Sequence, residues 1–202
     1  MQIDMRASLL SEAERIVRRV GYAAFSYADL AECVGIRKPS IHHHFRAKED
    51  LGAALVDAYT NRFTGCLSDI ADETENTFER FDRYTELYRA GLKAGEGCLC
   101  GVLASEIAGL PERVKAGVRR FFEANVKWLT TIFAQGQATG EIRADVNARS
   151  QGTAVLAGLE GAMLVSLALG SVNDFDAATE AIRAGLKPLP KAKTPRPSVA
   201  HN

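Results

Sequence analysis

Apolar residues recur at helical spacing along most of the chain, and the alternating pattern typical of strands is nearly absent. In residues 5–20 the apolar positions share one face and most charged residues lie off it. The pattern predicts helices over residues 5–20, 26–33, 37–43, 47–68, 77–93, 102–108, 111–139, 147–169 and 174–186. We therefore expect an all-α fold.

Short signals mark the ends of the first three helices. Gly21 ends the first helix, and Ser26-x-x-Asp29 has the spacing of a capping box at the start of the second. Pro39 lies in the first turn of the third helix, where a missing N–H costs little. A helix, a tight turn at residues 34–36 and a second short helix predict a helix-turn-helix within a three-helix head.

Charge is concentrated in this head. The whole chain balances 25 basic against 25 acidic residues, but residues 37–48 contain four Lys or Arg, three His and no acid. A cationic helix presented by a turn suits the major groove of DNA, although such a helix alone is more often a solvated surface. The neutral total charge argues against a non-specific nucleic-acid coat protein. The charge, turn and caps together favour a DNA-binding head.

The start of the third helix carries the side chains suited to reading DNA. Arg37 can pair bidentately with guanine, Lys38 can reach guanine or phosphate, and Ser40 can serve either role. Lys48, at the start of the long fourth helix, suits a phosphate. The predicted DNA-binding residues are Ser26, Tyr27, Arg37, Lys38, Pro39, Ser40, His42, His43 and Lys48.

The helical spacing also separates inward from outward positions in the third helix. Ile41 and Phe45 are four residues apart and share the face that packs inward. His42 and His43 point toward the groove or the DNA backbone. Successive residues on a helix diverge by about 100°, so the three consecutive histidines cannot converge on one metal ion. We expect no metal and no cofactor.

These motifs follow one another in a specific order. They run from Val20-Gly21-Tyr22 through Ser26, Leu30-Ala31-x-x-Val34-Gly35-Ile36 and Ser40-Ile41-His42-His43-His44-Phe45 to Lys48-Glu49-Asp50-Leu51. Residues 6–59 thereby resemble the N-terminal domain of the tetracycline-repressor (TetR) family of transcriptional regulators. His42 stands where that family most often has Tyr, and Ala28 lacks the basic side chain often found on the first helix of its motif.

The resemblance implies a helical C-terminal domain that dimerises and holds an effector pocket. We expect a DNA-binding domain at 1–50, an effector-binding and dimerisation domain at 51–187, and a disordered Pro- and Lys-rich tail at 188–202. Small residues in 151–170 permit close helix approach, so this segment and 174–186 are predicted to form half of a four-helix dimer interface. The alternative is that 151–170 is simply core of the monomer. Aromatic residues between 63 and 133 are mostly core, with some expected beside a cavity between the long helix and the helix after Pro111.

Cysteine usage and the absence of a basic-then-apolar leader in the first ten residues predict a cytoplasmic protein. Four cysteines without a secretory signal indicate reduced thiols. Residues 153–170 barely reach membrane-spanning length and contain Glu160 mid-segment, so an interface helix is the better interpretation. We expect no membrane partner.

One loop, residues 95–101, is chemically distinctive. It places Cys98 and Cys100 among glycines before a predicted helix, whose N-terminal dipole is expected to lower the pKa of the Cys98 thiol. The run Gly97-Cys98-Leu99 with Leu103-Ala104-x-Glu106 is similar to the branch typified by the N-ethylmaleimide-responsive repressor. That similarity implies a sensor role for Cys98, with Cys100 as its resolving partner.

Other interpretations of this loop remain open. Both cysteines can be small buried hydrophobes, as free cysteines usually are, and a bond across one intervening residue is strained. Cys33 and Cys66 are predicted to be packing residues. A cysteine-centred helical enzyme is a rival interpretation, but no base accompanies the loop, because every His except His201 lies in the head. A helical protein-interaction module with a cationic head is a second rival.

The sequence thus favours a non-enzymatic homodimeric regulator, most simply a repressor. It is expected to bind palindromic operator DNA and to be released by a small-molecule or thiol-reactive effector. Release requires an effector that binds the DNA-competent and DNA-incompetent states with different affinity. The long helix that starts near Lys48 is the expected lever between residues 95–101 and the head.

Overall fold

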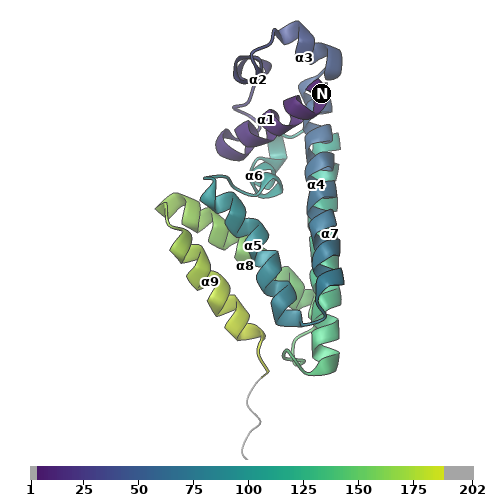
Figure 1. Cartoon of the computed structure of the whole chain (residues 1–202), viewed down its shortest axis with the longest axis vertical. Coiled ribbons are helices and arrows are strands. Elements are labelled where there is room, and N and C mark those ends of the chain that lie inside the picture. The colour runs from purple at the N-terminus through teal and green to yellow at the C-terminus, as the bar shows by residue number, and fades with distance from the viewer. Residues whose placement is uncertain (1–3, 189–202) are drawn as a thin grey trace, which may run out of the picture.

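The structure, a computed structural model, describes residues 4–188, and within them every regular element is helical (Figure 1). The all-α prediction is therefore confirmed. The predicted disordered tail, from 189 onward, lies outside the described residues. The elements are α1 (Met5–Val20), α2 (Tyr27–Val34), α3 (Lys38–His44), α4 (Lys48–Glu73), α5 (Thr77–Lys93), α6 (Leu99–Ser105), the 3₁₀ turn η1 (Ile107–Gly109), α7 (Glu112–Thr139), α8 (Ala148–Leu169) and α9 (Val172–Leu186).

Helices α1 to α3 form the head, and local capping fixes the turns between them. Ser26 caps α2 by accepting hydrogen bonds from the backbone N–H groups of Ala28 and Asp29, while the Asp29 carboxylate accepts from the Ser26 N–H. The predicted capping box is thus confirmed. Gly35 ends α2 in the left-handed conformation, with φ of 72°, which a residue without a Cβ adopts at little cost.

The head closes over a small core. Leu9 of α1, Leu30 of α2 and Ile41 of α3 are completely buried, and Phe45 just after α3 is 3% exposed. The prediction that Ile41 and Phe45 pack inward is therefore confirmed. Full burial of a side chain of this size contributes about 1.5–3 kcal/mol, so these residues hold α3 firmly on the head.

Helix α4 continues from the head along most of the length of the molecule, beside α7 (Figure 1). Its five extra residues beyond Ser68 carry it to Glu73. The proposed boundary at residue 50 therefore falls inside one continuous helix.

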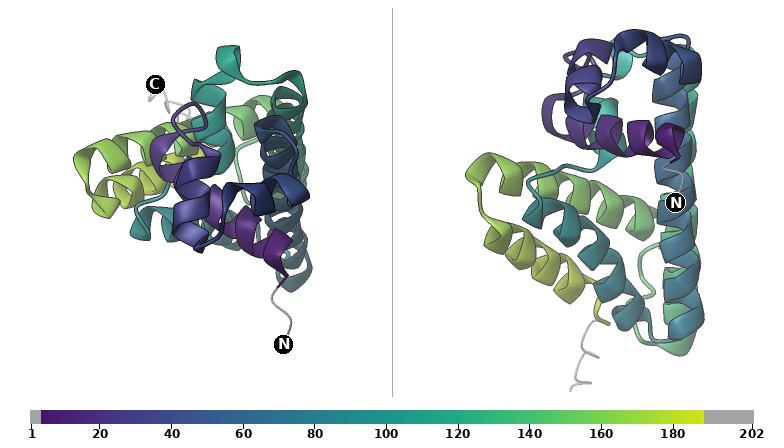
Figure 2. Two further views of the ribbon diagram at one scale, coloured as in Figure 1. Left: turned by 90° about the horizontal axis from the view of Figure 1, so that it is seen from above. Right: turned by 45° about the horizontal axis from the view of Figure 1, so that its top comes forward.

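The body is built from α4 to α9. Helix α8 packs most extensively on α7 and α9, and the two views of Figure 2 show α8 and α9 side by side at one edge of the molecule. Aromatic rings fill the space between α4, α5 and α7. Phe63 meets Phe121 edge-on at 5.1 Å between ring centroids, and Tyr84 stacks on Trp128 at 5.3 Å.

The segment after α5 differs from the sequence prediction. Helix α6 begins at Leu99, not at residue 102, and a 3₁₀ turn follows it. The reason is that Cys98 caps the helix: its Sγ accepts a hydrogen bond from the Gly101 N–H. Cys100 consequently lies inside α6 and is completely buried, so the predicted loop over residues 95–101 is shorter.

Helix α8 is long and apolar enough to cross a membrane by length and composition, and its surroundings explain that character. One side of the helix packs on α7 and α9. On the other side Leu164 is 65% exposed, Val165 54% and Leu169 64%. Within the single chain, α8 is thus a half-covered apolar helix.

Candidate DNA-binding surface and internal thiol site

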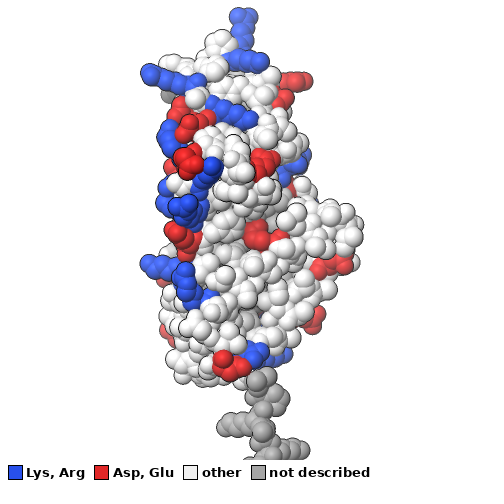
Figure 3. Space-filling model, turned by 180° about the vertical axis from the view of Figure 1, so that it is seen from behind, with Lys and Arg blue, Asp and Glu red and all other residues white. Residues whose placement is uncertain are grey.

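The start of α3 forms the exposed tip of the head. Arg37, Lys38, Pro39 and Ser40 are all exposed, and Figure 3 shows Lys and Arg side chains projecting from this end of the molecule. Because Ile41 anchors the opposite face of the helix, the exposed side chains are held on a rigid element. The structure thus places these four predicted residues at an exposed tip, and their contact with DNA stays a prediction.

His42 and Tyr27 contact each other and the turn that follows α3. His42 is exposed, yet its Nδ1 lies 3.1 Å from the Arg46 carbonyl oxygen and its ring meets Tyr27 edge-on at 4.9 Å. The Tyr27 hydroxyl lies 2.7 Å from the Ala47 carbonyl oxygen and 3.1 Å from that of Phe45. Burial raises the pKa of Tyr27 to about 12, so it stays a neutral donor. Tyr27 therefore points inward and positions the turn after α3.

Two other predicted DNA-binding residues are also engaged within the head. The Ser26 hydroxyl donates to Asp29 at 2.8 Å in the capping box. The Lys48 ammonium lies 4.5 Å from the centroid of the Tyr22 ring and 3.5 Å from the Ala23 carbonyl oxygen. Partial burial lowers the pKa of Lys48. Unlike these, His43 is exposed on α3, as predicted.

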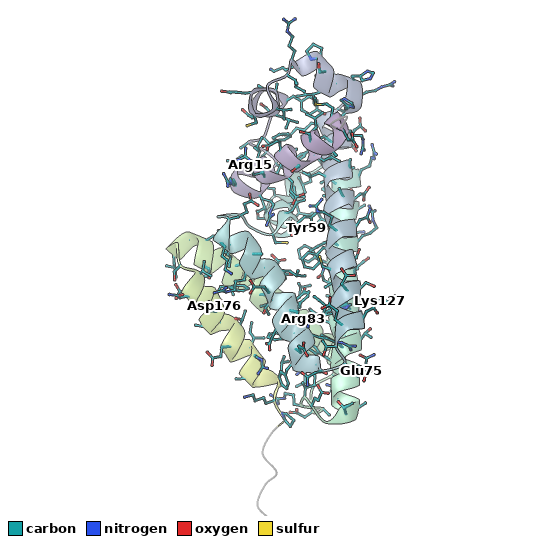
Figure 4. The ribbon with its side chains drawn as sticks, in the orientation of Figure 1. Arg15, Tyr59, Glu75, Arg83, Lys127 and Asp176 are labelled. Carbon is teal, nitrogen blue, oxygen red and sulfur yellow. The ribbon has the colours of Figure 1, made fainter. Side chains whose placement is uncertain are left out.

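The second site surrounds Cys98 at the junction of head and body. Cys98 is 3% exposed. Its Sγ receives hydrogen bonds from the Gly101 N–H at 3.4 Å and from the Tyr59 hydroxyl at 3.7 Å. Figure 4 shows Tyr59 at this junction. The backbone N–H of Cys98 points at the Met163 sulfur, 3.2 Å away, which ties α6 to α8.

The electrostatics of this site are the reverse of the sequence prediction. Burial and the neighbouring Glu160 carboxylate raise the pKa of the Cys98 thiol, although the Gly101 N–H opposes the rise. Burial likewise raises the pKa of Cys100, with Cys98 as a further cause. The hydrogen bond from the Gly101 N–H lowers the pKa of Cys98 by less than burial raises it. Cys98 is therefore a thiol at neutral pH and not a pre-formed thiolate.

Glu160 is the functional candidate that the sequence analysis did not assign to the site. Burial raises its pKa to about 7, while the nearby Cys98 thiol and Tyr88 hydroxyl favour its charged form. The Tyr88 hydroxyl oxygen lies 3.1 Å from that of Tyr84. The Tyr84 hydroxyl donates a hydrogen bond to Asn125 Oδ1 at 2.8 Å. The sequence offered one signal that could have identified it: Glu160 is a single carboxylate in the middle of an apolar segment.

The remaining cysteines and aromatics differ from the predictions. Cys33 and Cys66 are exposed, so they are not packing residues, because each lies on the outward face of its helix. The cleft that contains Tyr59 and Phe63 has a volume of about 320 Å³ and lies between α1, α4 and α5, not between α4 and α7. Against α7, the Phe63 ring packs directly on Phe121.

Polar contacts join the thiol site to the head. The Arg18 Nε of α1 donates to the Gly97 carbonyl oxygen at 2.6 Å, and the same guanidinium pairs with Glu96 at 2.9 Å. At the other end of α6, the Glu106 carboxylate accepts from the Ala23 N–H at 2.9 Å. The segment around Cys98 thus contacts α1 and the turn before α2 directly, in addition to any path through α4.

Comparisons with known proteins agree with this architecture. Residues 9–55 match the model of bacterial regulatory proteins of the tetR family, and residues 77–182 match that of the tetracyclin repressor-like C-terminal domain. The crystal structure of a TetR-family regulator from Agrobacterium tumefaciens superposes with a TM-score of 0.87 at 33% identity, over 90% of this chain and 97% of that one.

Named regulators are also similar. The transcriptional regulator AcuR of Cereibacter sphaeroides is 29% identical over 148 residues, which cover 71% of this chain and 68% of AcuR. The repressor NemR of Escherichia coli is 22% identical over 140 residues, 66% of this chain and 69% of NemR. The structure of its reduced form has a TM-score of 0.76 over 91% of this chain and 97% of NemR. The chain belongs to the TetR family of transcriptional regulators and is related to NemR.

Proposed function

We propose that this regulator is a cytoplasmic repressor that binds a palindromic operator as a homodimer and is released by an effector acting at Cys98. The observation that carries the proposal is the exposed start of α3, from Arg37 to Ser40, held on the head by buried Ile41. A two-fold dimer would present two such helices to successive major grooves of a palindrome.

The exposed side of α8 supports the homodimer. Leu164 and Val165 are more than half exposed, and Ala154, Ala157 and Gly161 continue the same exposed stripe at helical spacing. In Figure 3 charged side chains gather over the side of α4 and α7, whereas the side of α8 and α9 is mostly uncharged. Small and apolar residues on an exposed helix permit close packing against a second copy.

A path from Cys98 to the head supports effector control. Cys98 caps the start of α6, and Glu106 at the other end holds the turn before α2. A group attached to the buried Cys98 sulfur enters a cavity of only about 90 Å³, and a group that exceeds this space shifts α6. We propose that this shift changes the spacing of the two α3 helices, and thereby the affinity for DNA.

Lys38→Ala tests the DNA-binding surface. We expect the variant to bind the upstream DNA of its own gene more weakly, because one phosphate or base contact is lost. The slope of log affinity against log salt concentration should become shallower by about one. Fluorescence anisotropy over a range of salt concentrations measures both quantities. Lys127→Ala, an exposed lysine on α7, is the matched control. Equal binding to palindromic and scrambled duplexes would contradict the repressor and favour a protein-interaction module.

Cys98→Ser tests the effector site. We expect methyl vinyl ketone, a small thiol-reactive compound, to release wild-type protein from its operator and to leave the variant bound, because serine oxygen is a much weaker nucleophile. Cys66→Ser removes an exposed thiol instead and should behave as wild type. Anisotropy of labelled operator reports release. Release of the Cys98→Ser protein would contradict this role for Cys98.

A further inference from the structure

The side chain of His42 is held in one orientation although it is exposed on α3. Its Nδ1 atom lies 3.1 Å from the Arg46 carbonyl oxygen, and its ring rests edge-on against Tyr27. Tyr27 is itself fixed, because its hydroxyl bonds the carbonyl oxygens of Phe45 and Ala47. The ring of His42 is therefore preorganised before any DNA is bound.

These contacts determine which ring nitrogen carries a proton. A carbonyl oxygen only accepts hydrogen bonds, so Nδ1 of His42 is the donor toward Arg46. The other nitrogen, Nε2, makes no hydrogen bond with residues 4–188. In the neutral ring Nε2 is an acceptor, and only the charged ring donates from Nε2 while Nδ1 stays bonded to Arg46. The protonation state thus decides whether the free nitrogen of His42 attracts or repels a phosphate oxygen.

The position of the ring favours a phosphate over a base edge. In a helix-turn-helix the N-terminal residues of the second helix contact the bases, and the first helix crosses the DNA backbone. His42 lies one turn beyond the exposed tip that starts at Arg37, and its ring leans on Tyr27, the first residue of α2. The ring is therefore drawn away from the tip and toward the helix that crosses the DNA backbone.

We propose that the charged form of His42 donates a hydrogen bond from Nε2 to a DNA phosphate, so that each protomer takes up one proton when it binds its operator. The inference rests on the proposed function of α3 as the DNA-binding surface. It goes further by making operator affinity depend on pH. A tyrosine at this position would donate from its hydroxyl without titrating near neutrality.

The charges around His42 explain why the proton binds together with DNA. Lys38, Arg46 and Lys48 lie close to it in the chain and disfavour a further positive charge in the free head. A phosphate within about 4–6 Å reverses this, because an opposite charge favours the charged ring. The proton comes from solvent, and the complex binds it more tightly than the free protein does. Operator affinity must then fall as the pH rises through the range in which histidine titrates.

The other titratable groups on the packed elements keep their charge in this range. On α2, burial raises the pKa of Tyr27 to about 12, and hydrogen bonds from Ser26 lower the pKa of Asp29. On α4, a hydrogen bond from Arg113 lowers the pKa of Asp50. Both carboxylates therefore stay ionised between pH 6 and 8, and Tyr27 stays neutral.

Two further histidines must be separated from His42 by experiment. Within residues 4–188 they are His43 and His44, whose rings meet edge-on at 5.4 Å. His44 is half-buried and lines a polar groove with Arg6 and Asn61, on the side of α1 and α4. It is therefore the matched control, since it adds a third imidazole to α3 in a different environment.

Operator binding at different pH values tests the inference. We expect the affinity of the full-length protein for the upstream DNA of its own gene to fall roughly tenfold or more from pH 6 to pH 8. If each protomer of a dimer binds its proton about tenfold more tightly on DNA, the limit is about 100-fold. Titration calorimetry in Pipes and in imidazole, two buffers with different ionisation enthalpies, counts the protons that are taken up at pH 7.

Three variants assign the proton to one residue. His42→Gln should lose most of the proton uptake and most of the pH dependence, because its amide does not titrate. His44→Gln makes the same change on the groove side and should keep both. His42→Tyr should bind DNA with an affinity that is nearly independent of pH, because its hydroxyl donates throughout the range.

Other results overturn the inference. Operator binding without proton uptake, or uptake that persists in His42→Gln, would show that His42 does not bind the proton. An affinity that rises with pH would mean that the neutral ring accepts a hydrogen bond from a base amino group instead. If circular dichroism shows that the Gln variant is unfolded, His42→Tyr takes its place in the comparison. A protein that binds neither its upstream DNA nor any palindromic duplex at any pH would refute the proposed function itself.

Discussion

A glutamate in place of Ala157 is expected to separate the proposed dimer and to lower operator affinity by roughly 100-fold or more, because the two heads would no longer bind as a linked pair. Ala157 lies on the exposed side of α8, between Ala154 and Gly161. Around a two-fold axis each residue lies near its own copy or near a facing patch of the same kind. Each protomer would then place a charge in a closely packed apolar interface, where desolvation is costly.

Sedimentation velocity and operator binding measure the two effects separately. Ala134→Glu makes the same change at an exposed position on α7 and should leave both the dimer and the affinity unchanged. A dimeric Ala157→Glu protein with full affinity would show that the copies associate through another surface. A monomeric protein that still binds the palindrome tightly would instead contradict the need for a dimer.

The elements of the head were predictable because their signals are local. Ser26 and Asp29 cap α2, Gly35 permits the tight turn, and Ile41 with Phe45 define the inward face of α3. Each of these signals depends on residues within four or five positions along the chain. The bounds of α1 and α5 follow in the same way from helical periodicity.

The chemistry of Cys98 was not predictable from local signals. A helix predicted to start four residues after Cys98 suggested a lowered pKa, yet Tyr59 and Glu160, from α4 and α8, decide the environment of the sulfur. Desolvation depends on every element that covers a group, and no spacing in the sequence reports it. The same reasoning explains Lys48, whose ammonium turns toward Tyr22, 26 residues earlier.

Both ends of α6 contact the head, which changes the expected route of effector control. The sequence suggested α4 as the lever, and α4 does join the head to the body. However, Gly97 is hydrogen-bonded to Arg18, and Glu106 is hydrogen-bonded to the backbone of Ala23. A movement of α6 therefore reaches α1 and the turn before α2 without passing along α4.

Glu106→Ala separates these two routes. Effectors typically change the affinity for a second ligand by 1–3 kcal/mol, or about 5–150-fold. If the Glu106–Ala23 contact transmits the movement of α6, the variant should bind operator within about twofold of wild type but lose most of its response to modification of Cys98. Glu106 Oε1 would lie within 2.1 Å of a Cβ at Gly21, so the carboxylate is seated directly on this turn.

The comparison requires equal modification of both proteins. Mass spectrometry establishes that Cys98 is fully modified before operator affinity is measured, so a lost response cannot reflect a lost reaction. Glu123→Ala, which removes an exposed carboxylate from α7, should respond as wild type does. If Glu106→Ala is released as efficiently as wild type, the turn before α2 is not needed. The coupling free energy must then pass through Arg18 or along α4, whose first turn lies against the head through Lys48 and Tyr22.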